Sequence, residues 1–207
     1  MTTWAEQERA ALADALEQLG PDAPTLCDGW TTKEMAAHVY VREHRPDASL
    51  GVLPLGPLSS YTERVMRSVL RTLGYDELVR RLRTPSPWVR LGNIDALINT
   101  TEFFIHTEDV RRPNGLALRD HPEEFERAIW RRASKQARLS FRRVDARVRL
   151  IPTVGDPVES GSGEVVEVRG LPSELLLLEF NRKDAARVDM TGATTAVDKL
   201  RSARLGL

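Results

Sequence analysis

Three residues that can hold a metal ion fall on two expected helices. His38 lies in one helix, and Glu102 and His106 lie four residues apart in another. Side chains four residues apart share one face of a helix, and a carboxylate near a core is costly unless it is paired or binds a metal. A Glu and a His joined by a second His suit a divalent cation, and three protein ligands leave coordination positions open, as in catalytic sites.

Each of these residues also has an ordinary interpretation. The pattern Glu-x-x-x-His is frequent by chance, Glu102 can equally lie at the surface, and a single histidine such as His38 is more often a core or surface residue than a ligand. The residue types alone therefore leave both interpretations open.

The helices that must position these residues follow from apolar periodicity. Thr31 and Glu34 have the spacing of a capping box, which starts the helix that carries His38 and ends before Pro46. A Pro- and Gly-rich stretch over 46–58 predicts an irregular connection. The expected helices are 3–19, 31–45, 59–73, 76–83, 93–112 and 121–139.

The period changes after residue 145. Alternating residues predict strands at 147–151, 164–169 and 187–190, and helical spacing predicts helices at 172–181 and 193–202. The predicted fold class is α+β, with a helical domain over 1–142 and a small α/β domain over 143–207.

Composition narrows the function classes. The chain of 207 residues is 41% hydrophobic and 29% charged, with 30 basic and 30 acidic residues, so a nucleic-acid partner is not expected. Cys27 is the only cysteine, which excludes an intramolecular disulfide. The N-terminal residues lack a signal peptide, and no apolar run is long enough for a bilayer. A cytoplasmic protein without a membrane partner is expected.

Three stretches carry a resemblance to a known family. Residues 26–38 (LCDGWTTKEMAAH) and 102–112 (EFFIHTEDVRR) resemble two signatures of the mycothiol-dependent maleylpyruvate isomerase N-terminal domain, a member of the DinB-like superfamily. Residues 167–182 resemble the small domain that follows it. The resemblance spans nearly the whole chain, is nearest to a subgroup other than the isomerase itself, and implies a DinB-like four-helix bundle before the α/β domain.

The resemblance also implies a ligand set and a chemistry. His38, Glu102 and His106 match the family's metal ligands. The ligand types suit Zn first, and also Ni, Fe or Co. The implied function is a thiol-dependent transferase or isomerase, in which the metal activates a thiol or water and mycothiol is a co-substrate beside an electrophilic small molecule. Related bundles often dimerise, so a homodimer is one expected assembly.

Further residues near these motifs have weaker roles. No residue is assigned to catalysis, and Asp109 and Arg42 are the two candidates. Asp109 either orients a ligand histidine or is a surface carboxylate, and Arg42 either lines the mouth of the site or faces solvent. Cys27 is more often a small buried side chain than a nucleophile. Trp30 is expected to pack before the Thr31 cap.

Two other function classes remain beside the enzyme. One is a non-catalytic metal-binding or ligand-binding bundle, which a fourth protein ligand on the metal would favour. The other is an interaction protein whose metal has been lost, which unchanged stability on chelation would favour.

Overall fold

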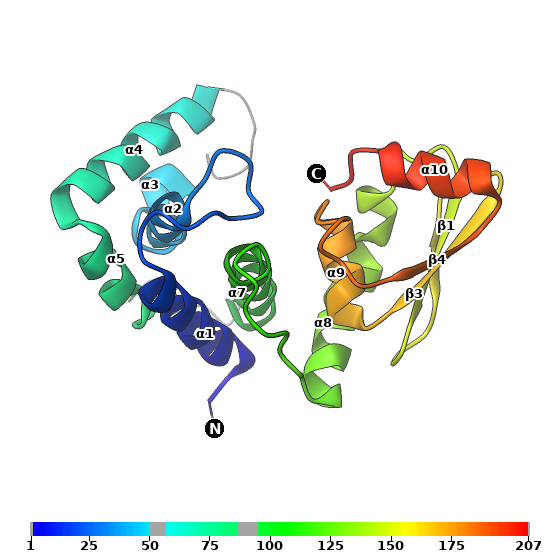
Figure 1. Cartoon of the computed structure of the whole chain (residues 1–207), viewed down its shortest axis with the longest axis horizontal. Coiled ribbons are helices and arrows are strands. Elements are labelled where there is room, and N and C mark those ends of the chain that lie inside the picture. The colour runs from blue at the N-terminus through cyan, green and yellow to red at the C-terminus, as the bar shows by residue number, and fades with distance from the viewer. Residues whose placement is uncertain (1, 50–56, 87–94, 207) are drawn as a thin grey trace. The chain divides into compact units, whose positions relative to one another are not determined.

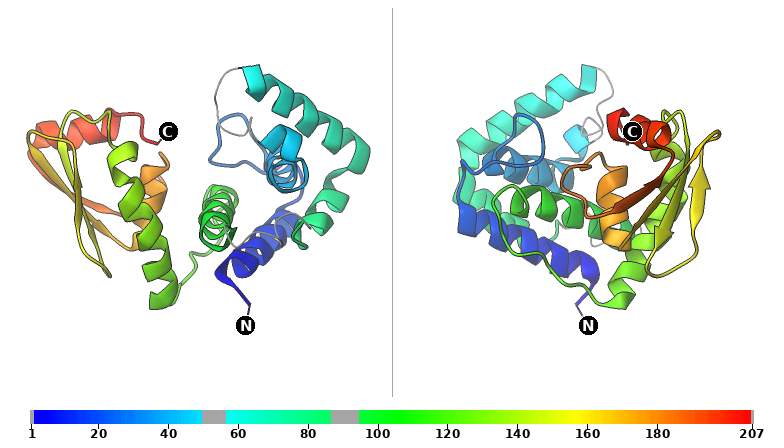
Figure 2. Two further views of the ribbon diagram at one scale, coloured as in Figure 1. Left: turned by 180° about the vertical axis from the view of Figure 1, so that it is seen from behind. Right: turned by 45° about the vertical axis from the view of Figure 1, so that its right-hand side comes forward.

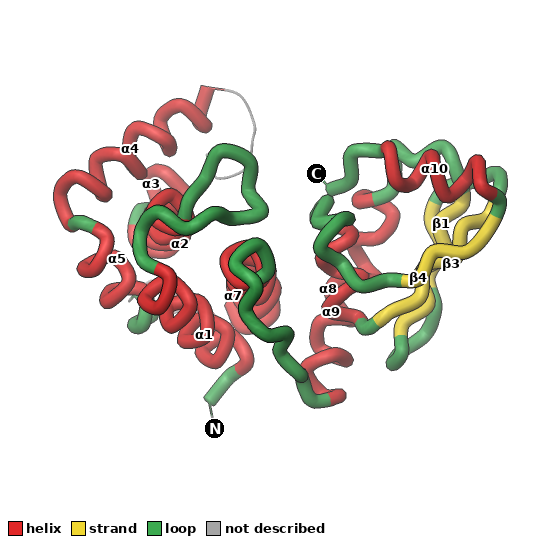
Figure 3. The backbone as a smooth tube through the Cα atoms, in the orientation of Figure 1, coloured by secondary structure: helices red, strands yellow, loops and turns green. Residues whose placement is uncertain are grey.

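Figure 1 shows the computed structural model, which describes residues 2–49, 57–86 and 95–206 and divides into two compact units, Met1–Leu118 and Arg119–Leu207. The first unit is helical, and the second combines helices with a sheet, as the colouring of Figure 3 makes plain. The predicted α+β class is therefore confirmed. Among the described residues, every helix is too short or too polar to cross a bilayer.

The helices of the first unit follow the predicted order. α1 packs against α7, and α2 packs against α4 and α5. The bounds are α1 (Trp4–Leu19), α2 (Thr32–His44), α3 (Pro46–Ser49), α4 (Pro57–Leu73), α5 (Tyr75–Leu82) and α7 (Asp95–Arg111).

Local signals explain where these helices begin and end. The Thr31 N–H donates to the Glu34 carboxylate at 2.9 Å, which confirms the capping box ahead of α2. Gly74 separates α4 from α5 with φ +76°, a conformation that favours glycine. The irregular connection predicted over 46–58 is wrong at both ends, because Pro46–Ser49 forms α3 and α4 already starts at Pro57. Residues 50–56 lie outside the described residues.

A buried ion pair joins the helices of the first unit. Arg9 on α1 donates to Glu43 on α2 through two guanidinium nitrogens, and the Nη2–Oε1 distance is 2.5 Å. Nη1 also donates to the Leu82 carbonyl of α5 at 3.2 Å, and the guanidinium lies 4.3 Å from the ring centroid of Phe103 on α7. Arg9 and Glu43 are each only 4% exposed, so one arginine connects four helices in the interior.

The second unit is built on a four-stranded sheet in the order β2-β1-β3-β4. β1 and β3 are parallel, and the two outer strands are antiparallel to them. Figure 2 shows the sheet with its helices from two further directions. The bounds are α8 (Glu123–Ser140), β1 (Arg147–Pro152), β2 (Val158–Ser160), β3 (Val165–Gly170), α9 (Pro172–Glu179), β4 (Asp189–Gly192) and α10 (Thr194–Ser202).

The second unit begins before α8, at Arg119, rather than at residue 143. α8 packs against α9 and contacts β2. The Glu126 carboxylate of α8 accepts hydrogen bonds from the Ser173 N–H at 2.9 Å and the Ser173 hydroxyl at 2.8 Å. The change of period after residue 145 marks the first strand, but it carries no information about which unit the preceding helix joins. β2 was not predicted, since three residues are too few for a visible alternation.

The ion pair of Arg9 and Glu43 should be essential for stability. Glu43→Ala leaves the Arg9 charge buried without its carboxylate, and loss of one partner of a buried pair costs about 3 kcal/mol or more. We expect that decrease in the free energy of unfolding, measured with urea. Glu63→Ala, which removes a carboxylate from an exposed ion pair with Arg67 on α4, is the control and should change little. A small effect of Glu43→Ala would contradict this account.

A second prediction concerns pH and Glu179, the last residue of α9. Its carboxyl is fully buried, Oε2 lies 3.5 Å from the Ser140 hydroxyl, and Oε1 is among the described buried atoms without a hydrogen-bond partner. Burial raises the pKa of Glu179 well above its usual value of 4.5. The folded chain therefore holds this proton more tightly than the unfolded chain, and stability falls as the pH rises from the unfolded pKa through the folded one.

Glu179→Gln should remove this loss, because glutamine has no proton to release. We expect the variant to exceed wild type in free energy of unfolding at the alkaline end of the window, measured with urea at several pH values. Glu124→Gln, an exposed position of α8, should keep the wild-type dependence. A Glu179→Gln profile that runs parallel to wild type would show that Glu179 does not titrate in this window.

Candidate metal centre

The structure places His106 of α7 near both His38 of α2 and Glu102 of α7. The rings of His38 and His106 lie 5.0 Å apart between centroids, with their planes at 81°. Glu102 Oε2 lies 3.6 Å from His106 Nε2. His38 and His106 are 7% and 9% exposed, whereas the Glu102 side chain is 31% exposed. The two histidines are thus buried, and Glu102 lies nearer to solvent.

His106 has a different partner at each ring nitrogen. Nδ1 lies 3.1 Å from Asp109 Oδ2, a hydrogen-bond distance. Nε2 is among the described buried atoms without a hydrogen-bond partner, since 3.6 Å to Glu102 is too long. If the Nδ1 proton is held by Asp109, the lone pair of the neutral ring lies on Nε2 and faces Glu102. A cation bound to Nε2 would give this buried lone pair the partner that it lacks.

The protonation states of His38 and Glu102 fit a cation site, whereas that of His106 favours a bound proton over a cation. Burial and the nearby His106 lower the pKa of His38 to about 3, so its ring is neutral at pH 7. Burial favours the neutral form of Glu102, but His106 and Arg42 outweigh it and lower its pKa to about 2, so the carboxylate is ionised. Burial opposes charge on His106 as well, yet the hydrogen bond to Asp109 and the proximity of Glu102 raise its pKa.

Arg42 lies beside Glu102 at the more exposed side of the site. It follows His38 by one turn of α2, its Nε lies 3.7 Å from Glu102 Oε2, and its Nη1 donates to Asn99 Oδ1 at 2.7 Å. The structure thus places Arg42 at the site, with 17% of its side chain exposed. Asn99 could not be singled out from the sequence, because a lone amide on a helix carries no signal of its own.

Asp109 is buried at the site, not at the surface. Its side chain is 0% exposed, and Oδ2 accepts from His106 and also from the Cys27 thiol, whose Sγ lies 3.4 Å away. Cys27, His106 and Asp109 offer ligand atoms that all lie within 4.8 Å of one another, and they are the group of metal-ligand type found among the described residues, one that includes neither His38 nor Glu102. The sequence favoured Cys27 as a small buried side chain and missed its contact with Asp109. The spacing of residues along the chain could not show that the loop carrying Cys27 packs against α7.

Of the remaining aromatic and histidine residues, Trp30 lies beside the candidate ligands, whereas His44 and His121 stack on other rings. The Trp30 ring lies 4.9 Å from the His38 ring, so Trp30 borders the site instead of serving only the helix cap. His44 stacks on Tyr40 at 4.4 Å, and His121 stacks on Phe125 at 4.2 Å in the second unit.

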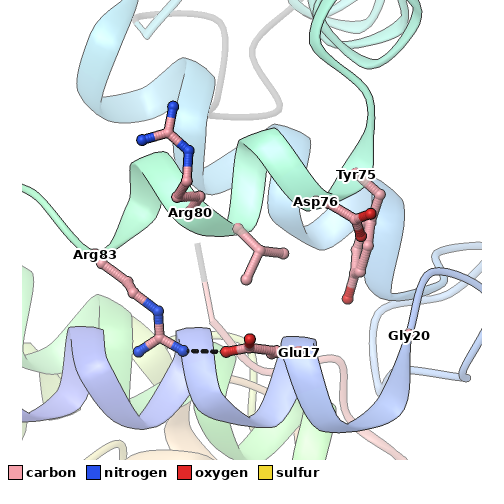
Figure 4. A pocket seen from close by; sticks show the side chains of 7 residues that line it. Glu17, Gly20, Tyr75, Asp76, Arg80 and Arg83 are labelled. Atoms are coloured by element: carbon pink, nitrogen blue, oxygen red, sulfur yellow. Dashed lines mark hydrogen bonds and ion pairs between the residues drawn. The ribbon is translucent and has the colours of Figure 1, made fainter.

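Two surface hollows lie apart from these residues. One of about 290 Å³ lies between α1 and α5, where Figure 4 shows Glu17 and Arg83 paired across it. The other, of about 420 Å³, is lined by residues such as Lys33, Leu70 and Arg71. Neither hollow is lined by a candidate ligand, so we assign neither to the chemistry of this site.

Comparison with known proteins identifies a fold. No protein family and no curated protein matches the chain by sequence. A crystal structure of the mycothiol-dependent maleylpyruvate isomerase matches with a TM-score of 0.51 at 15% identity, covering 94% of this chain and 96% of that one. The structure of a histidine-to-alanine mutant of that isomerase has a TM-score of 0.49 at 14% identity and similar coverage. At such identities the likeness establishes a shared fold alone.

The contact of Asp109 with His106 yields a direct prediction for the metal-free protein. Asp109→Asn removes the carboxylate that stabilises the imidazolium, so the pKa of His106 should fall. The shift is measured by an NMR pH titration of the ring resonances. Glu108→Gln, the neighbouring carboxylate on α7, which pairs with Arg112, is the matched control and should leave the pKa of His106 in place. An unchanged pKa in Asp109→Asn would mean that the two side chains are not bonded in solution.

Proposed function

We propose that this chain is a metal- and thiol-dependent transferase or isomerase, and that His38, Glu102 and His106 hold its divalent cation. The observation that carries the proposal is His106 Nε2, which is buried without a hydrogen-bond partner and faces the ionised Glu102 beside the neutral His38. Two imidazole nitrogens, each in its neutral form when it binds a metal, and one carboxylate are a common ligand set for Zn and related cations.

The surrounding residues have distinct tasks in this proposal. Asp109 holds the proton on His106 Nδ1 and so keeps the lone pair on Nε2. Arg42, anchored by Asn99, offsets the charge of Glu102 at the solvent side. A bound divalent cation supplies one chemical effect, a lower pKa of a thiol or water that binds it. Because the pKa of His106 is raised, a proton competes for Nε2 at acid pH, and cation binding should weaken there.

The fold similarity supports the choice of co-substrate. The structural neighbour is named as a mycothiol-dependent isomerase, and the match covers nearly the whole of both chains. On this basis we propose mycothiol, or a similar small thiol, as the co-substrate, and an electrophilic small molecule as its partner. We also propose that the helical elements form a DinB-like four-helix bundle. Among the described side chains near the site, none selects one electrophile over another.

A non-catalytic metal protein is the alternative function, and the Cys27 contact favours it. Cys27 and Asp109 offer ligand atoms on the Nδ1 side of His106, and a cation held there would leave His38 and Glu102 without the metal that the proposed chemistry needs. Turnover separates the two functions. The metal-loaded enzyme should consume maleylpyruvate or another electrophile only when mycothiol is added, whereas the non-catalytic protein should show no thiol-dependent consumption.

The metal content of protein purified without a histidine tag tests the first step. We expect about one equivalent of divalent metal in wild type, none in His106→Ala and much less in His38→Ala. His44→Ala is the matched control, because His44 lies on the same helix as His38 but stacks on Tyr40. Chelation should lower the midpoint of thermal unfolding of wild type, since a cation that binds only the folded state stabilises it.

Equal metal in wild type and His38→Ala would remove His38 from the ligand set. No metal in any of these proteins, even after addition of Zn or Ni, would overturn the metal site and the proposed enzyme with it.

A further inference from the structure

The Nδ1 side of His106 carries a second set of donor atoms that the proposed function does not use as ligands. Cys27 Sγ and His106 Nδ1 lie 3.4 and 3.1 Å from the same oxygen, Asp109 Oδ2. The three atoms are a sulfur, a nitrogen and an oxygen, contributed by the loop before α2 and by α7. Asp109 and His106 are 0% and 9% exposed, so two of the three donors are removed from water.

A hydrogen-bonded loop holds Cys27 in this position. The Thr25 hydroxyl accepts from the Cys27 N–H at 3.2 Å and donates to the Trp30 carbonyl at 2.9 Å. The Trp30 N–H donates to the Cys27 carbonyl at 3.0 Å, which closes the turn. The loop is bound to α7 itself, because the Leu26 N–H donates to the Asp109 carbonyl at 2.9 Å. The thiol therefore lies beside Asp109 because backbone contacts place it there.

The distances and charges fit a cation. Ligand bonds of roughly 2.0 to 2.3 Å at tetrahedral angles separate neighbouring donor atoms by roughly 3.3 to 3.7 Å. The observed 3.1 and 3.4 Å are close to these values, and all three atoms lie within 4.8 Å. A Cys27 thiolate and the Asp109 carboxylate carry two negative charges, which balance a divalent cation beside a neutral imidazole. Thiolate sulfur selects soft cations.

We propose that Cys27, His106 and Asp109 form a second cation position, which prefers soft divalent cations and excludes occupancy of the first. The two positions share His106, whose neutral ring has one lone pair and can serve only one side at a time. When a cation binds the second position, Cys27 releases its thiol proton to solvent, and the imidazole proton moves from Nδ1 to Nε2. The position needs neither His38 nor Glu102, so variants at those two residues separate a test of this position from a test of the proposed function.

The test uses the full-length, metal-free protein and Cd²⁺ as the probe. Cys27 is the only cysteine of the chain, so any sulfur-to-cadmium charge-transfer absorption must come from it. We expect the absorption to saturate at about one equivalent in wild type and in His38→Ala, and to be absent in Cys27→Ser. Asp109→Asn should weaken Cd²⁺ binding at least about tenfold, the lower end of what loss of a metal-site partner costs. Circular dichroism checks that each variant is folded.

Each other outcome overturns the proposal. Cd²⁺ that binds without the absorption would leave Cys27 as a hydrogen-bond donor to Asp109 only. If Asp109→Asn binds Cd²⁺ with the wild-type affinity, as followed by the absorption, the cadmium ion is held by the thiol of Cys27 without the Asp109 carboxylate. No Cd²⁺ binding at all would also contradict it. If Zn still binds wild type and is lost in His38→Ala in any of these cases, the proposed function stands while this second position falls.

Discussion

His106 is buried with a carboxylate facing each ring nitrogen, and the arrangement around it follows from the cost of burying such a ring. Asp109 lies at hydrogen-bond distance from one nitrogen, while Glu102 lies too far from the other to bond with it. A spacing of three and four residues places both carboxylates on the face of α7 that carries His106. His106 Nε2 is left buried without a hydrogen-bond partner, and this is the physical reason to expect a cation there.

The position of α2 relative to α7 decides whether His38 lies close enough to His106 to bind the same cation. Glu43 lies on α2 five residues after His38, and Arg9 pairs with it while lying over Phe103 of α7. A guanidinium and a carboxylate joined by two parallel hydrogen bonds have a defined geometry. This buried pair does not involve the candidate ligands, and it restricts how far α2 can shift relative to α1 and α7. The side chains that perform the proposed chemistry thus depend on an interaction outside the site.

Much of the fold could be predicted because helices and longer strands leave a periodic signal. The Thr31 and Glu34 pair and the break at Gly74 are local features, and both were readable from the sequence. The placement of α8 and the short strand β2 were not, since each depends on contacts with residues distant in the sequence.

In the site, too, local features could be predicted from the sequence, whereas contacts between distant segments could not. Glu102 and His106 share a helix face whatever the rest of the chain does, so their proximity was predictable from spacing. The loop that returns Cys27 to Asp109 is closed by backbone hydrogen bonds that no pattern of residue types encodes. Trp30 has a half-buried ring beside His38, a contact that likewise exists only in three dimensions. Resemblance to a family suggested the ligand histidines, and it gave no indication of the second group around His106.

The most direct test of the metal site is a crystal structure of the Zn-loaded protein with anomalous diffraction recorded at the zinc edge. We expect one anomalous peak about 2 Å from His106 Nε2, bonded also to His38 and Glu102, with His106 Nδ1 still paired to Asp109. A zinc peak bonded to Cys27 and Asp109 instead, or no peak at His106, would contradict the proposed ligand set.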